Sequence, residues 1–399
     1  MRVIFPACTE ARRPPSFFPR LVPLLLVLCA GRASSSPFYS PGWGFRIDLP
    51  EEYEYSGGDG RERFSFVSPQ GAALDLVVYN GTYASIEAMA ADAGRRIGNT
   101  GDMSYFDYRG RKACLMELDF AIGGNARGGW GLCVELGTPS GNAAGRIPLL
   151  LALAYGGGNI PDILHLSVLD SIAPSEAERR ASGPVTAFSY PGGEMREIQL
   201  EFIEGQSVLV AEHDAEGAQA LVDREFAVLR RYAGSPLLEA ARVRFYRAVY
   251  RDSWERLADA AFKLERYWNV PGDGGPSSLP PAAFAEKALK WVQSFTYERD
   301  LAGSDFVNLV SAAAEGRGDC DSRAMLWAII LAQANIPAAM MVSPAYDHAM
   351  GLADLPGEGA RFEAGGVNWL VAETTADVGI GLIEKEVSVT DYWSAVIFE

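Results

Sequence analysis

The chain has 399 residues, a formal net charge of −16 and only three histidines, and it is 48% hydrophobic and 22% charged. This composition indicates two or three folded domains that bury substantial cores. The acidic balance argues against a nucleic-acid partner, because a nucleic-acid-binding domain needs a basic patch.

The first 33 residues have the pattern of an export signal. Several arginines precede an apolar run at residues 21–28, which is too short to span a bilayer but suits the hydrophobic region of a signal peptide. Small residues around Ala33 predict cleavage after that position. Two alternatives stay open: Cys29 becomes lipidated, as in a lipoprotein, or the segment remains as an uncleaved anchor. We expect an exported protein of the periplasm, cell envelope or extracellular space, with any membrane contact made through this segment.

Residues 37–174 are expected to form one α+β domain with an antiparallel sheet. Ile86, Met89 and Ala93 recur at helical spacing, which predicts a helix over 85–97. A second helix is expected over 163–172, at the end of the domain. Alternating or continuous apolar runs predict strands at 45–50, 64–67, 73–79, 103–108, 113–120, 130–136 and 148–155.

The order of these elements, together with the segments 45–50 and 169–172, resembles the PsbP-like α+β fold. The resemblance implies a fold and no activity. The region shows no cluster of catalytic residue types, and His165 stands among apolar neighbours, as a packing histidine does. We therefore interpret the domain as a binding or positioning module.

Two cysteines lie in consecutive predicted strands of this domain. Gly123 and Gly124 separate Cys114 from Cys133 and favour a hairpin turn. A hairpin there can place the two cysteines opposite each other, and an exported protein can oxidise them to a disulfide. Two buried free thiols are the alternative. On either interpretation, Cys320 is the odd cysteine left after the signal segment.

The segment 184–275 is predicted to contain a β-hairpin and helices, after a polar linker at 175–184. His213 opens the helical part and is expected to be a surface residue. The segment either belongs to the last domain or stands apart from it. Strands are expected at 196–203 and 207–212, and a helical stretch over 213–268 with one break at 234–236.

Residues 277–399 carry the strongest chemical pattern in the chain. Ser277 and Ser278, followed by two prolines, predict the start of a helix. A second helix is expected over 322–334, and because it is apolar nearly all round it should be central and buried. Cys320 lies in a tight Gly-Asp-Cys-Asp turn directly before that second helix.

The position of Cys320 indicates a reactive thiol. A side chain at the first turn of a helix faces unpaired backbone N–H groups and the positive end of the helix dipole. Both are expected to lower the pKa of Cys320 and to favour the thiolate. The same N–H groups can form part of an oxyanion hole. We therefore interpret Cys320 as a catalytic nucleophile.

His348 and Glu373 are the expected partners of the thiol. His348 begins a predicted strand, and Glu373 ends another. Adjacent antiparallel strands would bring the two side chains together, so that His348 can exchange a proton with Cys320 and Glu373 can fix the imidazole tautomer. Asp377 competes for the third role, and Asp347 is a weaker competitor because it directly precedes His348.

The Gly-Asp-Cys turn, the spaced histidine and the carboxylate-x-Thr sequence at 373–375 resemble the bacterial transglutaminase-like superfamily over residues 280–380. The resemblance implies a papain-like α+β fold with a Cys-His-Asp triad. The family usually has Asp where this chain has Glu373, whose extra methylene changes the reach of the carboxylate. For the oxyanion donor, Gln293 and Tyr297 are candidates beside the backbone N–H of Cys320.

The fold class expected for the whole chain is α+β. An N-terminal antiparallel-sheet domain is followed by the helical segment and by the papain-like, transglutaminase-like domain at 277–399. We expect no metal and no cofactor, because the three histidines are scattered and the chain has no Cys-x-x-Cys pair.

These residues predict an exported cysteine-dependent enzyme that transfers acyl groups from amide bonds through a thioester on Cys320. We favour a peptidase or amidase over a transamidase, because water is always available to attack the thioester. A protein or peptide substrate is expected. The alternative is a transglutaminase-like binding scaffold of the cell envelope, with weak or no catalysis.

Overall fold

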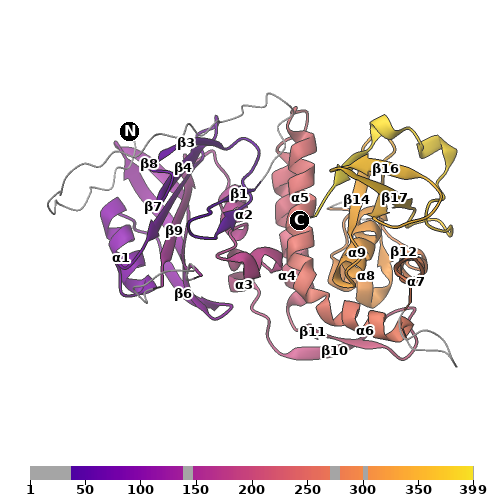
Figure 1. Ribbon diagram of the computed structural model, residues 1–399. Helices are drawn as coiled ribbons and strands as arrows, with labels where there is room; N and C mark the ends of the chain where they lie inside the picture. Colours follow the sequence, from indigo (N-terminus) through magenta and orange to yellow (C-terminus); the bar gives the residue numbers. More distant parts are fainter. Residues whose placement is uncertain (1–36, 138–146, 270–278, 300–303, 399) are drawn as a thin grey trace, which may run out of the picture.

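The computed structural model describes residues 37–137, 147–269, 279–299 and 304–398. The predicted signal segment with Cys29 and Ala33, and the predicted helix-capping serines Ser277 and Ser278, lie outside these ranges. The described chain is a mixed α/β structure with several sheets (Figure 1). Within the ranges just given, no helix combines the length and apolar character that a membrane crossing requires.

A seven-stranded antiparallel sheet forms the N-terminal domain, in the order β3-β4-β5-β9-β8-β7-β6. A separate short pair, β1 (Phe38–Tyr39) and β2 (Arg46–Ile47), replaces the longer strand expected at 45–50. The other expected strands are present. The strands of the sheet are β3 (Glu54–Gly58), β4 (Arg63–Val67), β5 (Ala73–Tyr79), β6 (Met103–Tyr108), β7 (Arg111–Ile122), β8 (Asn125–Glu135) and β9 (Leu149–Gly156).

Two helices cover opposite faces of this sheet (Figure 1). α1 (Ile86–Ile97) starts where predicted, because the Ser85 hydroxyl accepts a hydrogen bond from the Ala88 N–H. Its apolar face packs on every second residue of the central strands, and α2 (Asp162–Asp170) packs on the alternate residues. Both faces of the sheet are therefore buried, which explains the continuous apolar runs in the sequence.

The segment predicted as a polar linker is structured instead. It contains a 3₁₀ helix, η1 (Glu176–Arg180), and the short helix α3 (Pro184–Ser189). Glu178 is buried, and its carboxylate lies 3.1 Å from the Arg111 Nε. The polar composition was misleading here, because charged residues can be buried when they are paired.

The middle segment forms a hairpin and three helices. The hairpin pairs β10 (Met195–Gln199) with β11 (Ser207–Ala211), as predicted. The helical stretch is interrupted twice and not once, because the chain also turns at Leu257, which is buried. The helices are α4 (Asp214–Arg230), α5 (Leu238–Arg256) and α6 (Ala258–Trp268).

The C-terminal part is built on a five-stranded sheet of order β16-β17-β15-β14-β18. Two further short strands, β12 and β13, pair in parallel with each other and form a separate sheet. The strands are β12 (Thr296–Tyr297), β13 (Arg317–Gly318), β14 (Ala338–Ser343), β15 (His348–Ala353), β16 (Arg361–Ala364), β17 (Val367–Ala372) and β18 (Ser394–Val396). The helical elements are α7 (Pro281–Gln293), α8 (Leu309–Glu315), α9 (Cys320–Gln333), η2 (Lys385–Val387) and η3 (Thr390–Tyr392).

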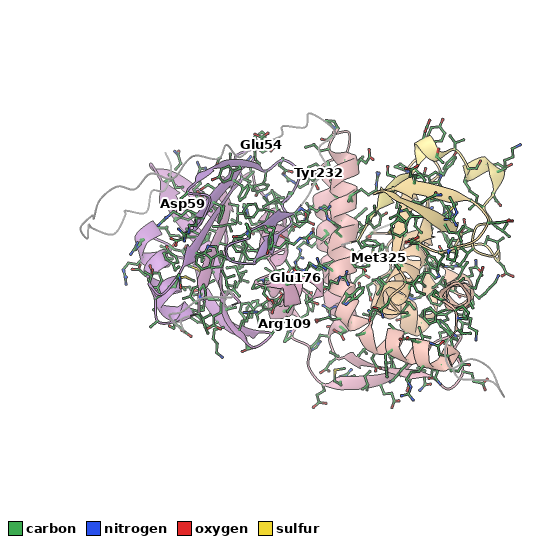
Figure 2. All side chains as sticks on the ribbon, in the orientation of Figure 1. Glu54, Asp59, Arg109, Glu176, Tyr232 and Met325 are labelled. Carbon is green, nitrogen blue, oxygen red and sulfur yellow. The ribbon has the colours of Figure 1, made fainter. Side chains whose placement is uncertain are left out.

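One hydrophobic core joins the middle segment to the C-terminal part. Phe245 of α5 and Leu264 of α6 belong to the same buried cluster as Trp327 of α9, and Met325 lies deep within it (Figure 2). Tyr232, between α4 and α5, belongs instead to the core of the N-terminal domain. Helices α4 and α5 therefore pack on both cores and stand between the two sheets (Figure 1).

Candidate active site

Cys320 is the first residue of α9, the fully buried central helix predicted from its apolar sequence. Asp319 caps this helix: its carboxylate accepts hydrogen bonds from the backbone N–H and the hydroxyl of Ser322, at 2.8 and 2.6 Å. Buried Arg323 holds the turn from the other side, because it donates to the carbonyls of Gly318 and Phe295. The thiol is thus carried by a turn with few degrees of freedom.

His348 and Glu373 come together as the sequence predicts. His348 is the first residue of β15, Glu373 directly follows β17, and the two strands pair antiparallel with Gly351 opposite Ala372. His348 Nε2 lies 2.8 Å from Glu373 Oε2. This bond occupies one ring nitrogen, so Nδ1 is the nitrogen that remains for proton exchange with a thiol.

Glu373 is itself held in place by Thr375. The Thr375 backbone N–H and hydroxyl donate to Glu373 Oε1 at 2.7 and 2.6 Å. Burial raises the pKa of Glu373, but the hydrogen bonds from His348 and Thr375 outweigh it and lower the pKa below its ordinary value. Glu373 is therefore an ionised carboxylate beside the imidazole.

A cavity of about 590 Å³ brings Cys320 and His348 onto one surface. The backbone N–H of Ala349, the residue after His348, forms a hydrogen bond with the Cys320 sulfur. The opposite wall comes from the middle segment and includes Phe226 of α4 and Phe245 of α5. The middle segment therefore builds part of the candidate site, in addition to sharing the core.

The electrostatics around Cys320 differ from the sequence-based expectation. Burial raises the pKa of the Cys320 thiol, and the carboxylates of Asp321 and Asp319 raise it further. Hydrogen bonds from the backbone of Ala349 and Asp321 act in the opposite direction but are smaller. The prediction of a thiol with a lowered pKa was therefore wrong, because it considered the helix terminus and left out the burial of the thiol and the charges of its two neighbouring carboxylates.

Asp319 and Asp321 form a buried pair on either side of the thiol. Burial, followed by repulsion from Asp321, raises the pKa of Asp319 to about 7. Burial also raises the pKa of Asp321, against a 2.7 Å hydrogen bond from the Tyr246 hydroxyl. Tyr246 comes from α5, and no pattern in the sequence singled it out, because it contacts a residue 75 positions away.

The two side-chain candidates for the oxyanion donor differ in whether their polar groups are free to bind an oxyanion. Gln293 is not available, because its amide donates to the carbonyls of Glu373 and Val378 at 2.8 and 2.9 Å. It positions the strand end that carries Glu373. Tyr297 is half exposed on β12, beside β13 and the thiol turn. Burial, then the charge and hydrogen bond of Cys320, raise the pKa of Tyr297 to about 12, so its hydroxyl stays protonated next to the thiol.

The competing carboxylates do not contact the imidazole. Asp377 is exposed and lies 2.5 Å from Lys290 Nζ. Asp347 accepts hydrogen bonds from Arg299 and has a left-handed backbone with φ of 51°. Glu373 is thus the carboxylate that the structure places against His348.

The remaining candidates lie outside this site. Cys114 and Cys133 face each other across β7 and β8, as the hairpin predicts, but both are buried free thiols and form no disulfide. His165 is buried, and burial lowers its pKa to about 4, which fits a packing residue. His213 lies at the surface, 3.3 Å from Glu216. In the described parts of the chain, no three His, Cys, Asp or Glu side chains are grouped as metal ligands.

No family model matches the chain, and no curated protein matches it. Among solved structures, it is similar to the cyanobacterial PsbP (CyanoP) of Synechocystis, at 16% identity and a TM-score of 0.28 over 38% of this chain and 99% of that one. A Bacteroides thetaiotaomicron structure matches at 12% identity and a TM-score of 0.26 over 54% of this chain and 76% of that one. LpqN of Mycobacterium tuberculosis, which is involved in cell envelope biogenesis, matches at 12% identity and a TM-score of 0.23. The match covers 31% of this chain and 78% of that one.

None of the three concerns a transglutaminase-like protein by its description. At TM-scores this low they carry no argument about activity, so the function has to be argued from the residues around Cys320.

Proposed function

We propose that this chain is an exported cysteine-dependent acyl-transfer enzyme that cleaves amide bonds through a thioester on Cys320. The observation that carries the proposal is the hydrogen bond between His348 Nε2 and Glu373 Oε2, beside a cavity that His348 and Cys320 both line. A cysteine nucleophile needs a base within reach and a third group that orients that base. On this proposal, Cys320 is the nucleophile, His348 is the base and Glu373 orients the base.

In the proposed reaction, the Cys320 sulfur attacks the carbonyl carbon of the amide while His348 takes the thiol proton. The tetrahedral oxyanion accepts hydrogen bonds from the Tyr297 hydroxyl and from backbone N–H groups in the first turn of α9. When the C–N bond breaks, His348 gives its proton to the leaving amine and a thioester remains. Water then attacks the thioester with His348 as base, and the carboxylic acid leaves as the thiol regains its proton.

The raised pKa of Cys320 determines when the proton moves. Because burial, Asp321 and Asp319 all favour the neutral thiol, the resting site holds Cys320 as a thiol. His348 then acts as a general base during the attack, in place of a preformed thiolate–imidazolium pair. Hydrolysis is favoured over transamidation, because water is always present and an amine acceptor would need a subsite of its own.

A protein or peptide is the proposed substrate. The cavity wall formed by Phe226, Phe245 and Phe306 suits an apolar side chain next to the bond that is cleaved. Three arginines, among them Arg242, and four aspartates also line the cavity, so its wall is apolar in one part and charged in another. A peptide carries such an apolar side chain next to an amide carbonyl, which the thiol can attack.

A binding scaffold of the cell envelope with weak or no catalysis is the second candidate. The observation that favours it is the carboxylate pair Asp319 and Asp321, which disfavours a thiolate at Cys320. A site selected for nucleophilic attack commonly lowers the pKa of its thiol. On this proposal, Cys320 packs at the helix start, and the cavity binds a peptide without cleaving it.

The deciding experiment is the rate of Cys320 alkylation by iodoacetamide against pH. The protein starts at Ser34 and carries Cys114→Ser and Cys133→Ser, with His348 intact or replaced in His348→Ala. Below the ~8.5 pKa of a free thiol, we expect faster modification with His348 intact than in His348→Ala. Equal rates at every pH would remove the base from the mechanism and overturn the enzyme proposal.

A second readout separates catalysis from binding. A mixture of unlabelled peptides is incubated with the protein, and the products are identified by mass spectrometry. We expect new peptide ends that depend on Cys320 and disappear in Cys320→Ala. Peptides that are retained by both proteins and cleaved by neither would support the scaffold.

A further inference from the structure

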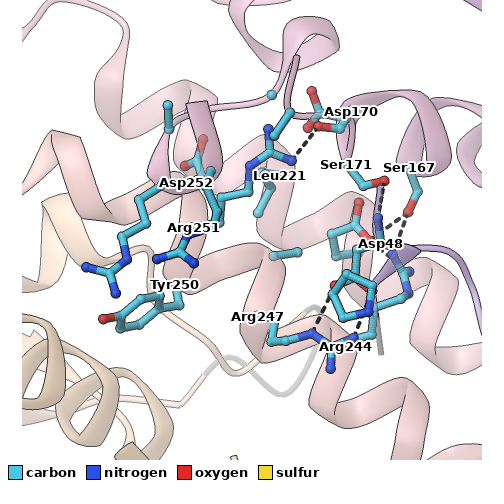
Figure 3. A pocket seen from close by; sticks show the side chains of 18 of the residues that line it. Asp48, Ser167, Asp170, Ser171, Leu221, Arg244, Arg247, Tyr250, Arg251 and Asp252 are labelled. Atoms are coloured by element: carbon cyan, nitrogen blue, oxygen red, sulfur yellow. Dashed lines mark hydrogen bonds and ion pairs between the residues drawn. The ribbon is translucent and has the colours of Figure 1, made fainter. Parts of the chain in front are cut away.

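A second cavity, of about 80 Å³, lies at the junction between the N-terminal domain and helices α4 and α5 (Figure 3). Its walls come from β2, α2, η1, α4, α5 and the chain end at Phe398. Seven arginines and four carboxylates line it. None of these residues belongs to the cysteine site, and nothing in the proposed catalysis uses them.

The four carboxylates of this cavity are already neutralised by arginines. Asp48 accepts two hydrogen bonds from Arg247, at 2.9 and 2.7 Å, and Glu225 accepts one from Arg244 at 2.9 Å. Asp170 pairs with Arg224. Asp252 pairs with Arg256, which does not line the cavity. Each of the four carboxylates is therefore already engaged by an arginine other than Arg251.

Arg251 donates its hydrogen bonds to neutral groups and not to a carboxylate. Its two terminal nitrogens donate to the backbone carbonyls of Asp170 and Ile172, each at 3.0 Å. The Nε of Arg251 is buried and has no hydrogen-bond partner among the residues that the structure describes. The Nε of Arg244, in the same wall, also makes no hydrogen bond, but it lies 3.8 Å from the carboxylate of Glu51. A buried guanidinium with an unsatisfied donor is costly unless an anion accompanies it.

We infer that this cavity binds a small oxyanion of the phosphate or sulfate type. Guanidinium groups bind such anions through several charge-assisted hydrogen bonds, and the Nε of Arg251 supplies a donor that no described residue uses. The volume is that of a few water molecules, which admits a small anion and excludes a polymer. The anion would connect α5 with α2 and η1, so it would hold the N-terminal domain against the helices.

Calorimetric titration of the chain from Ser34 with sodium phosphate tests the inference. Ionic strength is kept constant with sodium chloride, so that general screening does not contribute. We expect saturable binding of one phosphate per chain, weakened by about tenfold or more in Arg251→Met, because a charge-assisted contact is lost. The variant keeps an unbranched side chain for packing. Absence of saturable binding to the unmodified chain would overturn the inference.

Two control variants locate the anion. Arg95→Gln changes an exposed arginine on α1, paired with Asp92, and is expected to bind phosphate like the unmodified chain. Arg242→Gln changes the wall of the cysteine cavity and is also expected to bind normally. Loss of binding in Arg242→Gln, with Arg251→Met unaffected, would place the anion at the cysteine site and contradict the inference.

Circular dichroism shows whether Arg251→Met folds. If it does not fold, a second variant takes its place. Arg179 lines the same cavity from η1 and is partly exposed, so Arg179→Gln replaces it as the test and should also weaken binding. Phenyl phosphate is titrated in parallel and should not bind, because its ring does not fit the volume. Equal affinity for both would overturn the assignment to a small free anion.

Discussion

The hydroxyl of Tyr246 donates a 2.7 Å hydrogen bond to Asp321, the residue that directly follows the candidate nucleophile. Tyr246 lies on α5, outside the C-terminal part that carries Cys320, His348 and Glu373. The bond ties the middle helices to the first turn of α9. The electrostatics of Cys320 therefore depend on a helix that the local sequence around the thiol does not include.

Replacement of this tyrosine tests the link. In Tyr246→Phe, Asp321 loses a donor and remains buried, so we expect the free energy of unfolding to fall by about 1–3 kcal/mol. Urea denaturation followed by tryptophan fluorescence measures the change. Tyr392→Phe is the matched control, because Tyr392 is exposed. Equal stability of the two variants would show that the Tyr246 bond contributes nothing.

The charge of Glu373 is predicted to matter for catalysis. Glu373→Gln keeps the size of the side chain but removes the negative charge that stabilises the protonated imidazole, so kcat/KM should fall by about 10²–10⁴-fold. Peptide cleavage measures this loss. Asp377→Asn is the control on the same loop, since Asp377 pairs with Lys290 at the surface, and it should change the rate by less than about twofold. A larger loss in Asp377→Asn than in Glu373→Gln would reverse the assignment.

The sequence was sufficient to predict the elements that carry the candidate site, because each has a local signal. Asp319 caps α9 through its own side chain, and α9 is apolar on all sides. His348 starts a strand whose neighbour ends at Ala372, and antiparallel pairing brings Glu373 to it. Capping and alternation involve residues close in sequence, so they are visible without a structure.

Contacts between distant elements could not be predicted in the same way. The pattern of α5 indicates a helix, but it does not show that Tyr246 faces Asp321 or that Arg251 faces α2. The break at Leu257 has neither glycine nor proline to mark it. Gln293 is one of two side-chain candidates for the oxyanion donor in the sequence, whereas in the structure its amide is bound to two backbone carbonyls.

Tyr297 is predicted to act as an oxyanion donor. In Tyr297→Phe we expect kcat for peptide cleavage to fall by about 10²–10³-fold with a smaller change in KM, because the oxyanion forms only during the reaction. Tyr392→Phe again serves as the control. Unchanged kcat combined with faster alkylation of Cys320 would show instead that the hydroxyl only holds the resting thiol.

The two cysteines of the N-terminal domain are predicted to be unreactive. Burial raises the pKa of both Cys114 and Cys133, and both side chains lie in the core under α1. The pKa of Cys320 is raised too, but Cys320 lines a cavity together with His348. Mass spectrometry after brief iodoacetamide treatment of the chain from Ser34 should therefore show one adduct, at Cys320. Treatment in urea should show three. A mass two units lower, with no adducts at Cys114 and Cys133 in urea, would indicate a disulfide and contradict the free thiols.

Asp319 is predicted to make the protein less stable as pH rises. Its pKa is raised from 3.8 to about 7 by burial and by Asp321. Between these values the unfolded chain has released the proton and the folded chain keeps it, so the free energy of unfolding falls with pH. Below pH 4 both states are protonated, and above about pH 7 the loss is complete. The slope is at most about 1.4 kcal/mol per pH unit for one proton.

Asp319→Asn isolates this contribution, because asparagine also caps a helix but does not titrate. Urea unfolding from pH 4 to pH 8 should show the variant gaining stability relative to the unmodified chain up to about pH 7, with a constant difference above it. Asp391→Asn changes a residue at the surface, and its free energy of unfolding should depend on pH in the same way as that of the unmodified chain. A stability difference for Asp319→Asn that does not change with pH would mean that Asp319 is already ionised at pH 4. Burial and repulsion from Asp321 would then not raise the pKa of Asp319, and the prediction would fail.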